Sequence, residues 1–133
     1  MVRPLVGGFD MRALALALAL ISTPSLAAEQ FDLVCEGRHK VSSLAKWQPM
    51  TLRMRLDLDA KAWCAQECST VLPISAVDAG RITLSRSDPA IRGVFTLRQI
   101  DRVSGKYEGF WSGEQEEATC SRAPFSGFPA TKF

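Results

Sequence analysis

The stretch Thr51–Asp59, "TLRMRLDLD", decides the fold of this 133-residue chain. Its apolar residues Leu52, Met54, Leu56 and Leu58 alternate with polar ones. A strict period of two places all apolar side chains on one face of a β-strand, whereas an amphipathic helix needs apolar residues spaced by three and four. One face of this segment therefore enters a core, and the other is charged and hydrated.

Strand-like segments recur on both sides of this stretch, and turn signals separate them about every 8–12 residues, a spacing typical of all-β domains. These segments are "EQFDLVCEG" (29–37), a strand that starts at "AWC" (62–64), "STVLPISAVD" (69–78), "RITLSR" (81–86), "GVFTLRQID" (93–101), "KYEGFWSG" (106–113) and "EQEEATCSR" (114–122). Pro73 confines its segment to an edge or a bend, because proline cannot donate to a sheet ladder. We predict an all-β fold: a small antiparallel up-and-down barrel or sandwich of seven to eight strands.

Two remaining segments lack a clear period. "RHKVSSLAKWQPM" (38–50) is compatible with a short strand or with one helical turn. "APFSGFPATKF" (123–133) contains two prolines and one glycine, so we expect an ordered coil over a barrel end or sheet edge. Its anchors would be Phe125, Phe128 and Phe133.

The N-terminal part has the layout of a secretory signal peptide. Arg12 precedes an apolar run from Ala13 to Ile21, and the small-residue stretch Ser25–Ala27 follows. The run is too short to cross a bilayer, which needs roughly 20 residues. We predict cleavage after Ala27 or Ala28, which leaves no stable membrane insertion. The chain would then comprise a signal peptide (1–27) and one periplasmic or secreted β domain (28–133).

The charge of this domain argues against nucleic acid as a partner. Residues 28–133 carry 14 basic and 13 acidic side chains, intermixed as in "RMRLDLDAK" (53–61). A nucleic-acid surface needs a concentrated basic patch. We therefore expect a different class of partner.

All four cysteines lie in the predicted mature domain. An even number of cysteines in a small exported chain indicates disulfides. Cys64 and Cys68 are neighbours across a short turn, so we pair them, which leaves Cys35 with Cys120. The C-x₃-C spacing between strands differs from the C-x-x-C of a thioredoxin-like centre. A metal site would need further Cys or His ligands nearby, and the single His39 lies close to Cys35 instead. We predict no metal and no cofactor.

Nothing in the sequence points to catalysis. His39 lies among charged residues and is interpreted as an exposed loop histidine, and no G-x-S-x-G element supports a Ser-His-Asp hydrolase. Glu114, Glu116 and Glu117 are interpreted as a solvated face, because they lack the ligand pattern of a calcium loop. No spacing favours a particular pair of carboxylates for glycoside chemistry. We predict that the protein is not an enzyme.

The large aromatic residues allow two interpretations, core filling or a partly exposed binding patch at a barrel mouth. They are Trp47, Trp63, Tyr107, Phe110 and Trp111. Phe110 and Trp111 are adjacent, so a strand would point them to opposite faces. One of the two should therefore lie off the core, where it could contact a protein partner or a small apolar ligand.

The string "SGKYEGFWSG" (104–113) resembles the periplasmic and membrane-bound inhibitors of C-type lysozyme, which are small antiparallel barrels with a disulfide. Their Ser-Gly-x-x-Tyr loop matches with one residue deleted, and Ser112 stands where their Trp-x-Lys-Gly strand has its lysine. The matching positions are Ser104, Gly105, Tyr107, Trp111 and Gly113. The resemblance implies a protein that binds a partner's cleft through the Ser104–Tyr107 loop.

Most of the domain is similar to uncharacterised small exported β-proteins of Gram-negative bacteria. The shared motifs are F-x-L-x-C-x-G (Phe31–Gly37), I-D-R-x-S/T-G-x-Y (Ile100–Tyr107) and C…P-F-S-G-F-P…K-F (Cys120–Phe133). This resemblance implies no activity. We therefore expect a non-enzymatic, disulfide-stapled binding domain of unknown ligand or partner, with a lysozyme-inhibitor-like protein as the alternative. The candidate binding residues are Ser104, Gly105, Tyr107, Phe110 and Trp111.

Overall fold

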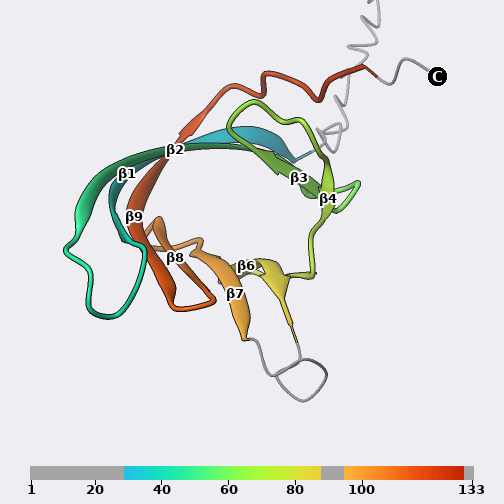
Figure 1. Ribbon diagram of the computed structural model, residues 1–133. Coiled ribbons are helices and arrows are strands. Elements are labelled where there is room, and N and C mark those ends of the chain that lie inside the picture. The colour runs from blue at the N-terminus through green and yellow to red at the C-terminus, as the bar shows by residue number, and fades with distance from the viewer. Residues whose placement is uncertain (1–28, 88–94, 131–133) are drawn as a thin grey trace, which may run out of the picture.

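The protein is described by a computed structural model that covers residues 29–87 and 95–130 (Figure 1). The predicted signal peptide therefore lies outside the described residues. All described strands belong to one antiparallel sheet in the order β4-β3-β2-β1-β9-β8-β7-β6-β5. The strands are β1 (Gln30–Lys40), β2 (Gln48–Asp57), β3 (Ala62–Ala65), β4 (Leu72–Pro73), β5 (Ala76–Val77), β6 (Arg81–Arg86), β7 (Thr96–Asp101), β8 (Lys106–Trp111) and β9 (Glu114–Ala123).

The predicted all-β, antiparallel fold is confirmed, but the strand count differs and the sandwich alternative is wrong. Figure 1 shows one sheet curled into a half-barrel, in which β9 returns to pair with β1. The ninth strand arises because the predicted strand 69–78 is divided into β4 and β5. The residues between β4 and β5 form hydrogen bonds in two directions: Ile74 N donates to Lys61 O, just before β3, and Ser75 N donates to Thr83 O on β6. Pro73 has no N–H to continue the ladder, and it lies on an edge strand as predicted.

The core occupies the concave face of this sheet, and the period-two pattern of 51–59 is confirmed. Leu52, Met54, Leu56 and Leu58 are all buried, while Arg53 projects to the outer face. The apolar side chains of β1, β3, β6, β7 and β8, and of the segment between β4 and β5, complete the core. Its main members are Phe31, Leu33, Trp63, Ile74, Ile82, Leu84, Ile100 and Tyr107.

Both predicted disulfides are confirmed. Cys35 and Cys120 are directly opposite each other on β1 and β9, with a Cα–Cα distance of 3.9 Å. Cys64 and Cys68 clamp the tip after β3, where Gln66 and Cys68 both have a φ of 55°. In the chain-entropy model a bridge that closes a loop as long as the first contributes about 4 kcal/mol. The two disulfides indicate an oxidising environment outside the cytoplasm.

Two sequence interpretations need correction. His39 is partly buried within β1 and is not a loop residue, because β1 extends to Lys40 and pairs with Glu116 on β9 at this level. The glutamates of β9 are not one solvated face: Glu117 is exposed, whereas Glu116 is partly buried on the inner face. Alternation along a strand sends adjacent side chains to opposite faces even when all of them are acidic.

The C-terminal segment 124–130 forms the predicted ordered coil. Phe125 and Phe128 pack edge to face, with ring centroids 5.3 Å apart, and Phe133 lies outside the described residues. The coil also has polar anchors that the sequence did not indicate. We call this coil the C-terminal strap.

Candidate functional site

The turn between β7 and β8 carries the loop of the lysozyme-inhibitor resemblance. The Asp101 carboxylate accepts hydrogen bonds from Val103 N (2.8 Å) and Ser104 N (2.9 Å). These backbone N–H groups lower the pKa of Asp101. Gly105 N donates to Asp101 O, and Gly105 adopts a φ of 74°, which favours glycine. The result is a preorganised turn that presents Val103, 90% exposed, at its tip.

The five predicted binding residues are not brought together. Ser104 and Gly105 lie in the turn, whereas Tyr107 is buried in the core. Phe110 and Trp111 lie at the opposite end of β8 and point to opposite faces, as predicted. Phe110 packs near Phe95, and Trp111 lies beneath the guanidinium of Arg98 at 4.2 Å.

A pocket of about 240 Å³ opens beside this turn, and we call it the mouth pocket. Strands β1, β6, β7 and β9 supply its inner wall, which reaches buried core residues. The wall consists of Phe31, Leu33, Ile82, Ile100 and Cys120, and the rim of Asp101, Arg102, Gly105 and Arg122. The predicted residue Gly105 therefore borders a pocket that sequence patterns alone did not reveal.

The charges around the rim of the mouth pocket are unequally paired. Arg102 is held by Glu29, with an Nη2–Oε2 distance of 3.2 Å, and by Asp78 O, to which it donates at 2.9 Å. Arg122 instead lies over the ring of Phe31, 4.4 Å from the centroid. No carboxylate among the described residues pairs with Arg122. Arg122 thus lies directly above an apolar wall without an ion-pair partner among the described residues.

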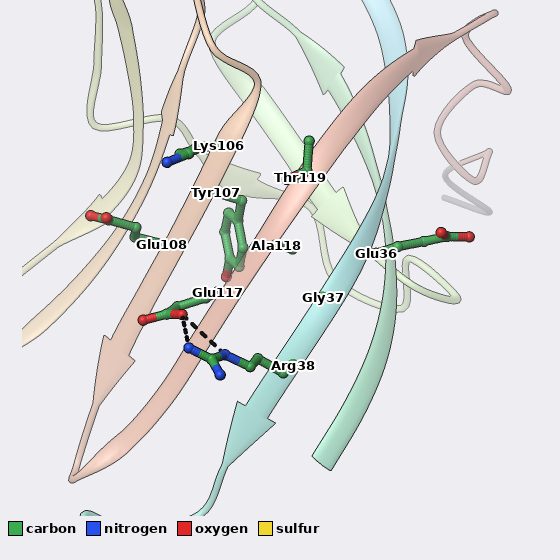
Figure 2. Close-up of a pocket in the computed structure, with 9 residues that line it drawn as sticks. All are labelled: Glu36, Gly37, Arg38, Lys106, Tyr107, Glu108, Glu117, Ala118 and Thr119. Carbon is green, nitrogen blue, oxygen red and sulfur yellow. Dashed lines mark hydrogen bonds and ion pairs between the residues drawn. The ribbon is translucent and has the colours of Figure 1, made fainter. Parts of the chain in front are cut away.

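A larger hollow of about 560 Å³ lies on the outer face of β1, β9 and β8 (Figure 2). Charged side chains dominate it, including the ion pair between Arg38 and Glu117 at 3.0 Å, in which both partners are about half exposed. Exposed pairs of this kind contribute about 0–1 kcal/mol. We interpret this surface as the hydrated side of the sheet, because its charges of both signs face solvent.

A polar cluster lies on the inner face at the level of Gly109. This glycine is paired with Arg98 on β7 and with Glu116 on β9. A Cβ at Gly109 would lie 2.8 Å from the Tyr107 hydroxyl oxygen and 2.9 Å from the Trp111 ring. The missing side chain therefore leaves the space in which the Tyr107 hydroxyl approaches Glu116.

Glu116 has a raised pKa. Burial raises its pKa, an effect that outweighs the opposing influence of Arg98 and of hydrogen bonding with Tyr107. Burial also raises the pKa of Tyr107. Glu116 Oε2 and the buried Trp63 Nε1 have no hydrogen-bond partner among the described residues. Carboxyl groups with shifted pKa values occur in functional sites and also in structural networks of ion pairs.

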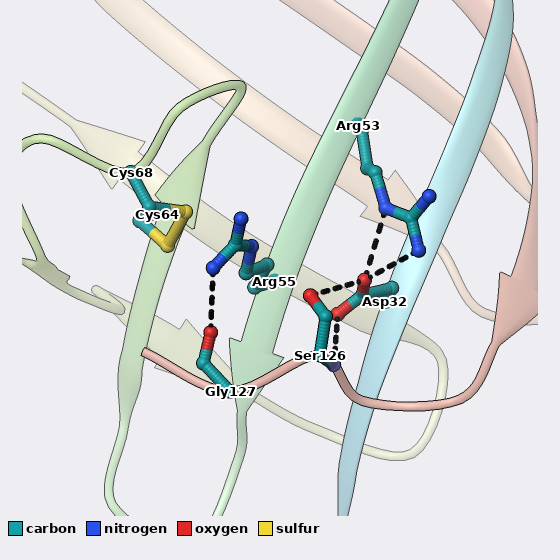
Figure 3. Close-up of a disulfide and its surroundings, with 7 residues drawn as sticks. All are labelled: Asp32, Arg53, Arg55, Cys64, Cys68, Ser126 and Gly127. Carbon is teal, nitrogen blue, oxygen red and sulfur yellow. Dashed lines mark hydrogen bonds and ion pairs between the residues drawn. A yellow bond between two sulfur atoms is a disulfide. The ribbon is translucent and has the colours of Figure 1, made fainter. Parts of the chain in front are cut away.

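A second carboxyl group, Asp32, is fully buried on the outer face of β1 (Figure 3). Arg53 donates to its Oδ2 through Nε (3.0 Å) and Nη2 (2.9 Å). Ser126 of the C-terminal strap donates through its backbone N to Oδ1 (3.1 Å) and through its hydroxyl to Oδ2 (2.7 Å). Burial would raise the pKa of Asp32, but these hydrogen bonds outweigh it, so the pKa is lowered. Arg55 also donates to Gly127 O at 2.8 Å, which fastens the strap to β2.

Sequence reasoning missed Asp32, Arg98 and Arg122, and it assigned Glu116 to a solvated face. The sequence does indicate that Glu116 and Arg122 point inward, because a period of two puts both on the face of Ala118 and Cys120. For Asp32 there was no such signal, because its burial depends on a strap that is distant in sequence.

Among residues 29–87 and 95–130, no group of three or more His, Cys, Asp or Glu side chains is arranged to hold a metal ion. The same residues contain no helix long and apolar enough to cross a membrane. In comparisons with known proteins, no family model, curated protein or solved structure matches this chain.

Proposed function

We propose that this chain is a non-enzymatic binding protein of the periplasm or the extracellular space, and that it holds a small apolar ligand in the mouth pocket. The observation that carries the proposal is the apolar wall of the pocket, which reaches Phe31, Leu33 and Ile100 in the core. The mouths of β-barrels are frequent ligand sites, because the curled sheet supplies an apolar interior and the rim supplies polar contacts.

The surroundings of the pocket favour a preformed site. Cys120, which lines it, is joined to Cys35 by the disulfide between β1 and β9. Its backbone N also donates to Gly105 O at 2.8 Å, which fixes the β7–β8 turn against β9. A rigid wall loses little conformational freedom when a ligand binds, and this supports affinity in a small site.

The proposal is tested by titrating the ¹⁵N-labelled protein, exported from the full chain, with 1-hexanol and recording amide chemical shifts. We expect the largest shifts at Leu33, Ile82 and Ile100. Ile100→Phe, which fills the pocket, should abolish them. Leu97→Phe, on the outer face of the same strand, is the matched control and should leave them unchanged.

Circular dichroism and thiol titration show whether both variants keep the fold and both disulfides. If Ile100→Phe does not fold, saturation-transfer contacts between hexanol and the wild-type side chains replace the variant. Binding without contacts to the pocket residues, or no binding at all, contradicts the proposal.

A second candidate function is a lysozyme-inhibitor-like interaction, which the preorganised β7–β8 turn favours. Val103 and Ser104 are exposed at its tip, but Tyr107 is buried, so the contact would involve only the turn itself. The test is inhibition of a C-type lysozyme by the purified protein. Val103→Glu should abolish inhibition, and Val41→Glu, at another exposed valine, should not. No inhibition at micromolar protein eliminates this candidate.

A further inference from the structure

We infer that the ligand of the mouth pocket is a short amphiphilic anion, an alkyl carboxylate whose chain lies against the core wall and whose head group binds Arg122. This inference rests on the proposed function and adds the charge and length of the ligand. It starts from the position of Arg122, whose guanidinium lies 4.4 Å above the ring of Phe31, itself part of the wall.

The pairing of the other rim charges singles out Arg122. Arg102 already contacts Glu29 and Asp78 O, so its guanidinium is engaged within the fold. Asp101 uses one carboxylate oxygen to hold the β7–β8 turn and also interacts with the charge of Arg81. Arg122 has no carboxylate partner among the described residues, and its donors match the planar geometry of a carboxylate.

The chemistry of the wall selects the other half of the ligand. Leu33, Ile82 and Ile100 contribute only apolar side chains to the wall, with exposed fractions of 7%, 2% and 3%. Each methylene that leaves water for such a wall strengthens binding by up to about fourfold. A fully hydrophilic anion would place polar groups against this apolar wall without hydrogen-bond partners, so an alkyl chain next to the head group fits better.

The size of the pocket limits the length of the chain. Its volume of about 240 Å³ lies below the roughly 300 Å³ at which pockets for drug-sized ligands begin. We therefore expect affinity to rise with chain length over the first few carbons and then to level off. Hexanoate is a suitable probe.

The experiment compares three ligands that share one chain and differ in the head group: hexanoate, 1-hexanol and hexylamine. Dissociation constants are measured by NMR titration on the protein exported from the full chain. We expect wild type to bind hexanoate about fivefold more tightly than hexanol, as for a partly exposed ion pair, and to bind hexylamine most weakly. Arg122→Gln should remove the preference for hexanoate, so that the ratio of the hexanol and hexanoate dissociation constants falls from about five to about one.

Arg86→Gln is the matched control, because Arg86 is an exposed arginine at the end of β6 away from Ile82, and this variant should keep the preference. The inference of an anionic ligand would be overturned if wild type bound hexanoate and hexanol equally well, or if the preference for hexanoate survived Arg122→Gln. In either case, binding of hexanol would still support the proposed function. Failure of all three ligands to shift the pocket amides would overturn the proposed function itself.

Discussion

Asp32 and Glu116 are two carboxyl groups of the same curled sheet, the first fully buried and the second partly buried, and their pKa values are shifted in opposite directions. Asp32 lies on the outer face under the C-terminal strap and accepts hydrogen bonds from Arg53 and Ser126. Glu116 lies on the inner face, where one of its oxygens has no partner among the described residues. The pKa of Asp32 is lowered and that of Glu116 is raised. Burial alone favours the neutral acid and raises the pKa. The number of hydrogen-bond donors to the carboxylate therefore decides whether the pKa is lowered or raised.

The two groups therefore contribute to stability in opposite pH ranges. The folded-state pKa of Asp32 is below its unfolded value, so its contribution is complete above the unfolded pKa and is lost as pH falls through the folded pKa. The folded-state pKa of Glu116 is above its unfolded value. Its contribution is complete below the unfolded pKa and is lost as pH rises through the folded pKa.

The largest effect is expected for Asp32→Ala. Removing the acceptor deprives Arg53 and Ser126 of a charged partner and releases the C-terminal strap, which should lower the free energy of unfolding by about 3 kcal/mol at pH 7. Urea denaturation measures the change. Glu36→Ala, at an exposed acid on the same strand, is the control and should have little effect. A loss below about 0.5 kcal/mol for Asp32→Ala would mean that the strap is held in another way.

Glu116→Gln should raise the free energy of unfolding, in contrast to Asp32→Ala. An ionised carboxyl group in a partly buried position is unfavourable, so the neutral amide should stabilise the fold by about 1 kcal/mol at neutral pH. At acid pH, where wild-type Glu116 is also neutral, the gain should vanish. Thermal unfolding at pH 7 and pH 4 gives both values. Destabilisation at pH 7 would show that the interactions with Arg98 and Tyr107 outweigh burial.

Much of the fold could be predicted from sequence, because strand patterns are local. The alternation in 51–59 correctly places Leu52, Met54 and Leu56 inside. The short spacing pairs Cys64 with Cys68, and this leaves Cys35 to pair with Cys120. The division of the predicted strand 69–78 into β4 and β5 was missed, because it depends on Ile74 and Ser75 bonding to two different neighbours.

The candidate site was less predictable, because its parts meet only through the curl of the sheet. The mouth pocket combines residues of β1, β6, β7 and β9, and no sequence spacing encodes their convergence. Tyr107 appeared to belong to a binding loop, yet it directly follows the turn and points inward. A one-residue step along a strand exchanges the two faces, so a short motif match does not fix which side chains are accessible.

Ser126→Ala tests the contribution of one hydrogen-bond donor, the Ser126 hydroxyl, which Asp32 has and Glu116 lacks. It removes the hydroxyl bond to Oδ2 but keeps the backbone bond to Oδ1, so we expect a loss of about 1 kcal/mol and a pKa of Asp32 closer to its ordinary value. Urea denaturation and NMR titration of the carboxyl carbon measure the two effects. The control is Ser121→Ala, because its hydroxyl makes only a long, exposed contact of 3.4 Å with Val34 O. An unchanged Asp32 pKa in Ser126→Ala would assign the shift to Arg53 and to the backbone N–H of residue 126.

Glu117→Gln should change the free energy of unfolding least. It tests whether burial determines how much a hydrogen-bonded carboxylate contributes to stability. Arg38 donates to Glu117 Oε2 through Nε and Nη2, the same two-donor pattern that Arg53 makes with Asp32. The difference is that Glu117 is about half exposed, whereas Asp32 is fully buried. Water can replace the arginine at Glu117, so we expect a loss below about 0.5 kcal/mol that decreases further in 1 M salt. Urea denaturation at two salt concentrations measures it. A loss as large as that of Asp32→Ala would mean that the hydrogen-bond pattern, and not burial, determines the contribution of a carboxylate in this sheet.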